Sequence, residues 1–137
     1  MKKNTAALLG GFAIVGLLLT GCAGGGQSKA DACKLISTEL TDSAAQLSAA
    51  FSGIATDPDK ATTDLKKIDT NFGETMDKVS NEDIKKPAQA TKESLSKVIS
   101  LLVAAAADPA KADQTALGDG ITAFQTDATD LQTACNS

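Results

Sequence analysis

The 137-residue chain contains no histidine, tryptophan or tyrosine, and all 13 of its basic residues are lysines. Without imidazole it cannot build a Ser-His-Asp triad, a Cys-His pair or a histidine metal site. Without arginine it lacks the planar guanidinium that binds phosphate or carboxylate through two hydrogen bonds. Its 17 acidic residues give a net charge of −4, whereas nucleic-acid binding needs a basic surface. The composition therefore argues against these enzyme classes and against a nucleic-acid partner.

The carboxylates do not form a pattern typical of catalysis or metal binding. Asp57, Asp59 and Asp64 lie close in sequence, but the central glycine and terminal glutamate of an EF-hand are absent. Asp127 and Asp130 share a helix face, which we interpret as a solvated surface. The chain also lacks a Gly-x-Ser-x-Gly nucleophile motif and a glycine-rich phosphate loop. We therefore predict no catalytic residue, no metal site and no bound cofactor.

The N-terminus has the pattern of an export signal. Met1-Lys2-Lys3 is cationic, and an almost wholly apolar run follows from Ala6 to Leu19. The run is shorter than the roughly 20 residues that span a membrane as a helix. This combination is typical of a cleaved signal peptide.

The residues Leu19-Thr20-Gly21-Cys22 follow directly and resemble the lipobox of bacterial lipoproteins, which ends in an obligatory cysteine. The resemblance implies cleavage between Gly21 and Cys22, so that residues 1–21 are the signal peptide. It also implies a thioether-linked diacylglycerol on Cys22, whose two acyl chains hold a protein stably where one chain is marginal. The implied location is the extracytoplasmic face of the cell membrane, with the membrane contacted through the lipid anchor.

Residues 22–29, which contain Gly24-Gly25-Gly26-Gln27-Ser28, have the composition of a flexible tether. Cleavage after Gly21 removes Lys2 and Lys3 and leaves 11 lysines against 17 acidic residues, a net charge of −6. An anionic bilayer surface repels such a domain. We expect the folded part, residues 30–137, to stand off the membrane.

Apolar residues in this part recur at spacings of three and four, which predicts four helices. The four series are Cys33, Ile36, Leu40, Ala44, Leu47, Phe51 and Ile54; Ala61, Leu65, Ile68, Phe72, Met76 and Val79; Ile84, Ala88, Thr91, Leu95, Val98, Leu102 and Ala105; and Leu117, Ile121, Phe124, Ala128, Leu131 and Cys135.

Asp57-Pro58 and Asp108-Pro109 are predicted helix starts, and the third helix starts at Asn81 or at Pro87. No segment alternates with the period of a strand. We predict an all-α, up-down-up-down four-helix bundle, with a three-helix arrangement as the alternative. Phe51, Phe72 and Phe124 are the predicted aromatic residues of its core.

If Cys22 carries lipid, Cys33 and Cys135 remain. They lie near the start of the first helix and the end of the last, which share one pole of such a bundle. Export permits a disulfide between them. A free thiol pair or a metal site is the alternative, although two thiolates are half of the four ligands that structural zinc takes.

Two further segments carry predictions. Val98 to Ala107 is apolar on more than one face, so that Ile99, Leu101 and Val103 form either an interaction patch or part of a wide core stripe. Gly118-Asp119-Gly120 interrupts the last helix. We expect a late helix start or a local distortion there, with a close helix contact as the alternative.

The functional prediction is a non-enzymatic interaction or structural module at the cell surface, with a protein partner whose identity the sequence does not give. It predicts a filled core and an exposed patch around Ile99 and Val103. A carrier of a lipid or small apolar ligand is the alternative, and it requires a cavity of roughly a few hundred Å³. The Ala, Thr and Asp bias and the terminal cysteines resemble small helical lipoproteins of actinobacteria. A phage-type lipoprotein that blocks superinfection has the same layout and is a third possibility.

Overall fold

The computed structural model describes residues 26–137, so Gly21, Cys22 and the predicted signal peptide lie outside the described residues. Residues 26–137 form helices α1 (Lys29–Ile54), α2 (Pro58–Asp77), α3 (Glu82–Ala107) and α4 (Gln114–Asn136), with a short 3₁₀ helix η1 (Pro109–Lys111) before α4. No β-strand occurs among these residues, and the all-α prediction is confirmed.

Polar side chains cap the first three helices. The hydroxyl of Ser28, the carboxylate of Asp57 and the amide oxygen of Asn81 each accept a hydrogen bond from a backbone N–H in the following turn. This satisfies donors that have no partner inside the helix. Asp57-Pro58 therefore starts α2 as predicted. Of the two starts considered for α3, the structure uses Asn81, and Pro87 lies inside the helix.

The second Asp-Pro pair behaves differently from the first. Asp108 precedes η1, whereas α4 begins at Gln114 behind its own cap, Asp113, which accepts a hydrogen bond from the backbone N–H of Ala116 at 2.9 Å. The prediction that Asp108-Pro109 starts the last helix is therefore wrong: this pair starts η1, and α4 begins only at Gln114. A second cap a few residues downstream makes the Asp-Pro turn a separate element.

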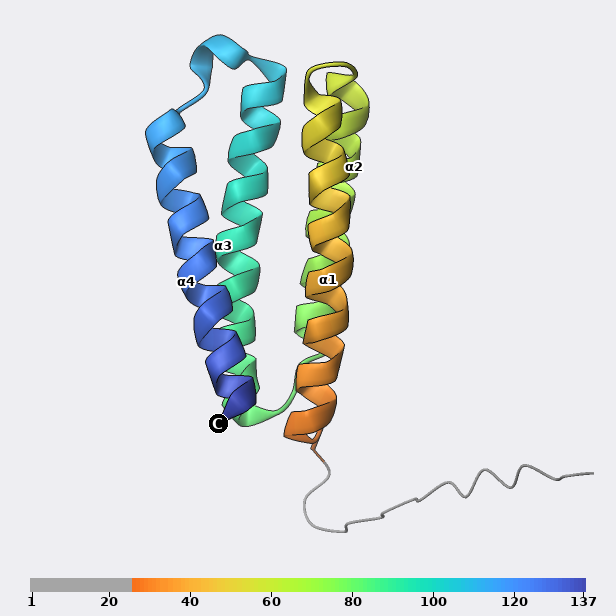
Figure 1. The fold of residues 1–137 in the computed structure, drawn as a ribbon, viewed down its shortest axis with the longest axis vertical. Coiled ribbons are helices and arrows are strands. Elements are labelled where there is room, and N and C mark those ends of the chain that lie inside the picture. The colour runs from red at the N-terminus through yellow and green to blue at the C-terminus, as the bar shows by residue number, and fades with distance from the viewer. Residues whose placement is uncertain (1–25) are drawn as a thin grey trace, which may run out of the picture.

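The chain reverses direction at each connection, so that α1 with α2 and α3 with α4 form two hairpins (Figure 1). Helices α2 and α3 join the hairpins along their length, whereas α1 and α4 have few contacts with each other. We call the end with the start of α1, the α2–α3 connection and the end of α4 the disulfide pole. The opposite end, with η1 and the α1–α2 connection, is the distal pole. The bundle is thus closed on three sides and open between α1 and α4.

The core lies mainly on α2 and α3. Helices α1 and α4 add few large side chains to it, chiefly Ile36 and Leu131. The fully buried large side chains of the other two helices and their connection are Leu65, Ile68, Phe72, Met76, Val79, Ile84, Leu95 and Ile99. Phe72 is in the core and Phe124 packs against it, but Phe51 is 47 % exposed. The prediction that Phe51 is a core residue is therefore wrong, because α4 does not cover the side of α1 that carries Phe51 near the distal pole.

Charged contacts gather on α2 and α3. The Lys92 ammonium on α3 lies 2.7 Å from the Asp77 carboxylate on α2. Hydrogen bonds from Lys92, and then from Gln89, hold the pKa of Asp77 below its ordinary value. On α2, the hydrogen bond that Lys60 donates to the carboxylate of Asp64 raises the pKa of Lys60. These pairs are solvated, and pairs of this kind add little to stability. Among the described residues, neither ion pair lies on the side of the molecule between α1 and α4.

Gly120 lies at a close contact between α3 and α4. Helix α4 runs without interruption through Gly118 and Gly120, so the predicted late start is wrong and the alternative, a close helix contact, is correct. A Cβ atom at Gly120 would lie 3.3 Å from Cγ2 of Val98 and 3.7 Å from Cδ1 of Leu101. A Cβ at Gly118 would have no atom within 4 Å.

These two glycines form a matched pair for mutation. Gly118→Leu raises the free energy of unfolding by about 0.8 kcal/mol, because leucine costs less backbone entropy in a helix than glycine. Gly120→Leu lowers it by about 1–3 kcal/mol, because the side chain must displace α3. Urea denaturation of both variants measures the difference. Equal effects at the two positions would contradict the close contact.

Candidate functional site

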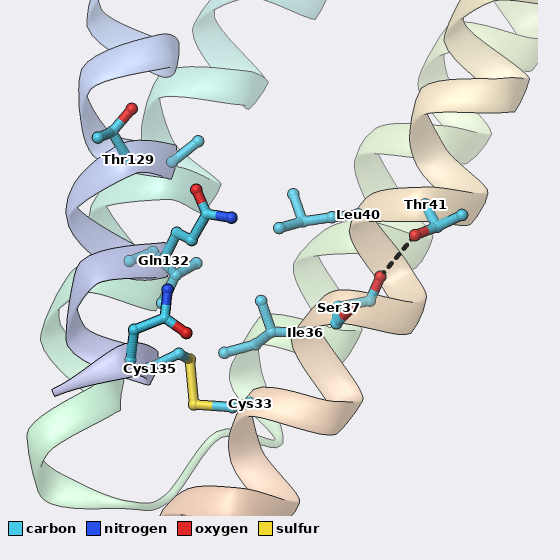
Figure 2. Close-up of a pocket in the computed structure, with 11 residues that line it drawn as sticks. Cys33, Ile36, Ser37, Leu40, Thr41, Thr129, Gln132 and Cys135 are labelled. Atoms are coloured by element: carbon cyan, nitrogen blue, oxygen red, sulfur yellow. Dashed lines mark hydrogen bonds between the residues drawn. A yellow bond between two sulfur atoms is a disulfide. The ribbon is translucent and has the colours of Figure 1, made fainter.

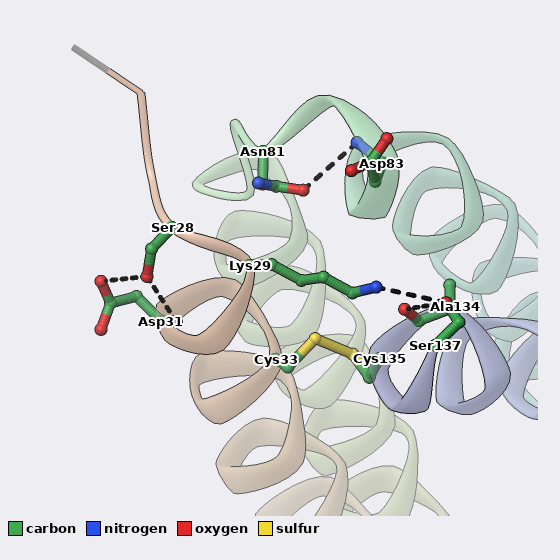
Figure 3. Close-up of a disulfide and its surroundings, with 9 residues drawn as sticks. All are labelled: Ser28, Lys29, Asp31, Cys33, Asn81, Asp83, Ala134, Cys135 and Ser137. Carbon is green, nitrogen blue, oxygen red and sulfur yellow. Dashed lines mark hydrogen bonds between the residues drawn. A yellow bond between two sulfur atoms is a disulfide. The ribbon is translucent and has the colours of Figure 1, made fainter. Parts of the chain in front are cut away.

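The two cysteines of the folded part meet at the disulfide pole. Cys33 on α1 and Cys135 on α4 form a disulfide, with Cα atoms 5.7 Å apart, as the sequence predicted (Figure 3). The bridge joins residues 102 positions apart. It fixes α1 to α4 at the end of the bundle where these two helices come together.

Hydrogen bonds tie the start of the described chain to the same pole. Lys29 Nζ donates to Ser137 Oγ at 3.2 Å (Figure 3). The side-chain oxygen of Gln27 accepts from the backbone N–H of Ser80 at 2.9 Å, and its carbonyl accepts from Nδ2 of Asn81 at 3.1 Å.

The predicted tether, residues 22–29, is therefore too long. Gln27 and Ser28 belong to the fold, and Lys29 is the first residue of α1. Gln27 is the fifth residue after Cys22, and five residue-to-residue steps of a fully extended chain span at most about 17 Å.

A cavity of about 490 Å³ lies between α1 and α4, directly beside the disulfide. Leu40 and Ile36 reach into it from α1, and Gln132 lies across from them on α4 (Figure 2). The rest of the lining is Cys33, Ser37, Thr41, Ala128, Thr129, Leu131, Cys135 and Asn136. Within residues 26–137, no acid and no lysine lines this cavity. Its chemistry is that of neutral hydrogen-bonding groups around an apolar floor.

The apolar residues of α1 and α4 match in height across this opening. Leu40, Ala44, Leu47 and Phe51 lie 7, 11, 14 and 18 residues after Cys33; Ala128, Phe124, Ile121 and Leu117 lie 7, 11, 14 and 18 residues before Cys135. Both helices rise about 1.5 Å per residue. Each residue of one series therefore stands level with its counterpart. We call these two series the α1 and α4 stripes.

The two stripes are only partly covered along their length. Leu40 and Leu47 pack partly against the core, as do Leu117 and Phe124. Phe51 is 47 % exposed and Ile121 is 38 % exposed. The helices are held together at the disulfide and separate above it, so neither stripe covers the other (Figure 1).

Among the described residues, no charged side chain of α1 after Ser37 and none of α4 points to this side of the molecule. Helix α1 has no charged residue after Asp42, and no lysine follows Ala112 in the chain. With about 100° per residue, Asp42 and Glu39 point roughly 180° and 120° away from Phe51. The acids of α4 point about 120–180° away from Ile121; they are Asp119, Asp127 and Asp130. We call this uncharged side, with its two stripes, the α1–α4 face.

The predicted interaction patch on α3 is not present as such. Ile99 is 2 % exposed and belongs to the core, and Leu101 and Val103 are half-buried. The alternative interpretation, a wide core stripe, fits all three residues. It arises because α3 packs against α2 on one side and α4 on the other. The exposed large apolar residues among residues 26–137 are Phe51 and Ile121.

The carboxylates and thiols of the described chain do not gather into a metal-binding group. No helix within residues 26–137 has the length and hydrophobicity to cross a membrane. Comparison of the chain with protein-family models, with curated proteins and with solved structures finds no match. The candidate site is therefore defined by its geometry: an open, uncharged face of two helices above a disulfide.

Proposed function

We propose that this chain is a bacterial lipoprotein, held at the extracytoplasmic face of the cytoplasmic membrane by diacylglycerol on Cys22. There its bundle acts as a non-enzymatic interaction module that binds a protein partner through the α1–α4 face. The observation that carries this proposal is the pair of level, partly exposed apolar stripes, in which Phe51 and Ile121 are the most exposed large side chains. Exposed apolar surface of this kind in a soluble domain is typical of a protein contact.

The position of the fold relative to Cys22 gives the domain an orientation. Gln27 is bound at the disulfide pole, so this pole lies within about 17 Å of the lipidated residue. Helix α1 has 26 residues and extends about 39 Å from there. Phe51, close to its end, is thereby held away from the bilayer, where another protein can reach it.

The composition of the α1–α4 face favours contact over reaction. Its polar groups are hydroxyls and amides, which donate and accept hydrogen bonds but do not titrate near neutral pH. The two groups whose pKa departs from its ordinary value, Lys60 and Asp77, lie on α2. A contact surface needs neither a general acid nor a general base.

A matched pair of cysteine variants tests this proposal on intact cells. Ser48 lies on the α1–α4 face and Thr70 on α2, and both are exposed helix residues with a hydroxyl. We expect a membrane-impermeant maleimide to label Thr70→Cys but not Ser48→Cys, because a partner covers the latter. Detergent extraction and dilution should then expose Ser48→Cys. Failure to label Thr70→Cys would contradict the location, and equal labelling of both would contradict the contact.

The cavity favours a second candidate, a carrier of a small apolar ligand. Its volume of about 490 Å³ is in the range of ligand sites, and Leu40 and Ile36 supply an apolar floor. A carrier would retain one apolar molecule per chain in native mass spectrometry. An interaction module would retain none and would still show protection at Ser48→Cys.

A further inference from the structure

We propose that the partner of the α1–α4 face is a second copy of this chain. The two copies pair about a two-fold axis parallel to the helices, so that α1 of each copy packs against α4 of the other. This inference rests on the proposed function for its membrane setting. Four features of the structure support it.

The first feature is the register of the two stripes. A two-fold axis along the bundle places α1 of one copy opposite α4 of the other, at unchanged height and in antiparallel direction. Residues equidistant from the disulfide are then level across the interface, as Leu47 and Ile121 are within one chain. The α1 stripe of one copy can thus cover the α4 stripe of the other, which the two stripes of a single chain do not do. Phe51 of one copy is then level with Leu117 of the other.

The second feature is the distribution of charge. The chain from Cys22 onward has a net charge of −6, which repels a second copy in most orientations. The α1–α4 face carries no charged side chain beyond Ser37. A two-fold interface brings the same patch of both copies together. An acidic patch would repel its own copy, whereas an uncharged patch does not.

The third feature is size. Helices α1 and α4 contain 26 and 23 residues, so the face is roughly 35 Å long and about 20 Å wide. Two such faces bury on the order of 1,400 Å², within the range of specific protein–protein interfaces. The small side chains of Ala44 and Ser48 let the facing helices approach closely.

The fourth feature is the position of the anchor. An axis parallel to the helices leaves both disulfide poles at the same end, so both Cys22 lipids reach one bilayer. An axis perpendicular to the helices would place the two anchors at opposite ends. Confinement to a membrane also raises the effective concentration of one copy around the other.

Two differently tagged full-length chains, co-expressed in bacteria, test the pairing. One carries Ser48→Cys and the other Ile121→Cys; these residues are exposed, and their heights above the disulfide differ by about 1.5 Å. We expect a short thiol-to-thiol cross-linker on isolated membranes to give a product with both tags and twice the chain mass. Replacing Ser48→Cys with Thr70→Cys, on α2, should abolish that product.

A charge variant provides the second readout. Ser48→Asp places a carboxylate on the face without burying it in the single chain, and Thr70→Asp makes the same change on α2. Sedimentation of detergent-solubilised protein should show that Ser48→Asp raises the dissociation constant of the dimer roughly tenfold or more, because the interface removes water from the new charge. Thr70→Asp should leave the dimer unchanged, and circular dichroism should report equal helix content in both variants.

The outcomes separate this inference from the proposed function. A membrane-bound chain in which Ser48→Cys is protected, but which gives no two-tag product and sediments as a monomer, overturns the second copy and leaves the interaction module in place. A chain that is absent from the membrane overturns the proposed function, whatever its oligomeric state. A monomer that carries a bound apolar molecule overturns the dimer in favour of the carrier.

Discussion

Replacing both Cys33 and Cys135 with alanine lowers the free energy of unfolding by about 4.7 kcal/mol, the chain-entropy value for a loop of roughly 100 residues. The bridge spans 102 positions, and α1 has few other contacts with α4. Domains of this size are stable by about 5–15 kcal/mol, so the loss is a large share of the total. The α1–α2 and α3–α4 hairpins should then separate at the disulfide pole, widening the cavity beside Leu40.

Urea denaturation with and without a thiol reductant measures this effect. Reductant should destabilise the wild type and have no effect on the double variant, since that variant has no bridge to break. Cys22→Ala is the matched control, because it removes a cysteine outside the bundle and should leave the unfolding curve unchanged. A loss below about 1 kcal/mol would mean that the bridge does not restrain the unfolded chain.

Cys22→Ala abolishes acylation, and those variant chains that have lost residues 1–21 move out of the detergent phase on phase separation. The expected effect is all-or-none, because each buried CH₂ contributes about 0.8 kcal/mol and two acyl chains supply essentially the whole membrane affinity. The domain itself, with a net charge of −6 after Gly21, has no electrostatic attraction to an anionic bilayer. Incorporation of an alkyne fatty acid into the wild type and its absence from the variant measure the change.

The control for this variant is the pair of cysteines in the bundle. Chains with Cys33→Ala and Cys135→Ala should incorporate the fatty acid like the wild type, since neither residue follows the Leu19-Thr20-Gly21 sequence. Acylation that persists in Cys22→Ala would place the lipid elsewhere and remove the basis for the orientation proposed above.

The sequence was sufficient to predict four helices and the disulfide between Cys33 and Cys135. Asp57-Pro58 predicts the start of α2 because the carboxylate caps the helix and proline fits its first position. The apolar series of α2 predicts its core face, from Leu65 to Met76, because this helix has neighbours on both sides. Cys33 and Cys135 were paired correctly because they lie at ends of helices that share a pole.

The exposed face could not be predicted in the same way. A spacing of three and four identifies the apolar side of a helix, but it does not say whether another helix covers that side. Phe51 and Ile99 are both apolar. The pattern places Phe51 in the core, although it is exposed, and it leaves Ile99 open between an interaction patch and a core stripe, although it is buried. The outcome depends on how far α1 and α4 separate, which is a property of the whole bundle.

One signal for that face was present in the sequence. The apolar residues after Cys33 and those before Cys135 have the same spacings, in opposite directions along the chain. Such a match is expected of two antiparallel helices that pack against each other, or of equivalent helices in two copies. The true length of the tether could not be predicted from the sequence. It depends on hydrogen bonds that Ser80 and Asn81, far along the chain, donate to Gln27.

The intact mass of the mature protein, purified from membranes without reductant, tests the central claim most directly. A disulfide-closed bundle anchored through Cys22 predicts a chain that begins at Cys22, carries one diacylglycerol, and is lighter by two hydrogens than its reduced form. Reduction should restore those two hydrogens without releasing the lipid. A chain that begins elsewhere with an unmodified Cys22, or one with two free thiols before reduction, would contradict the account.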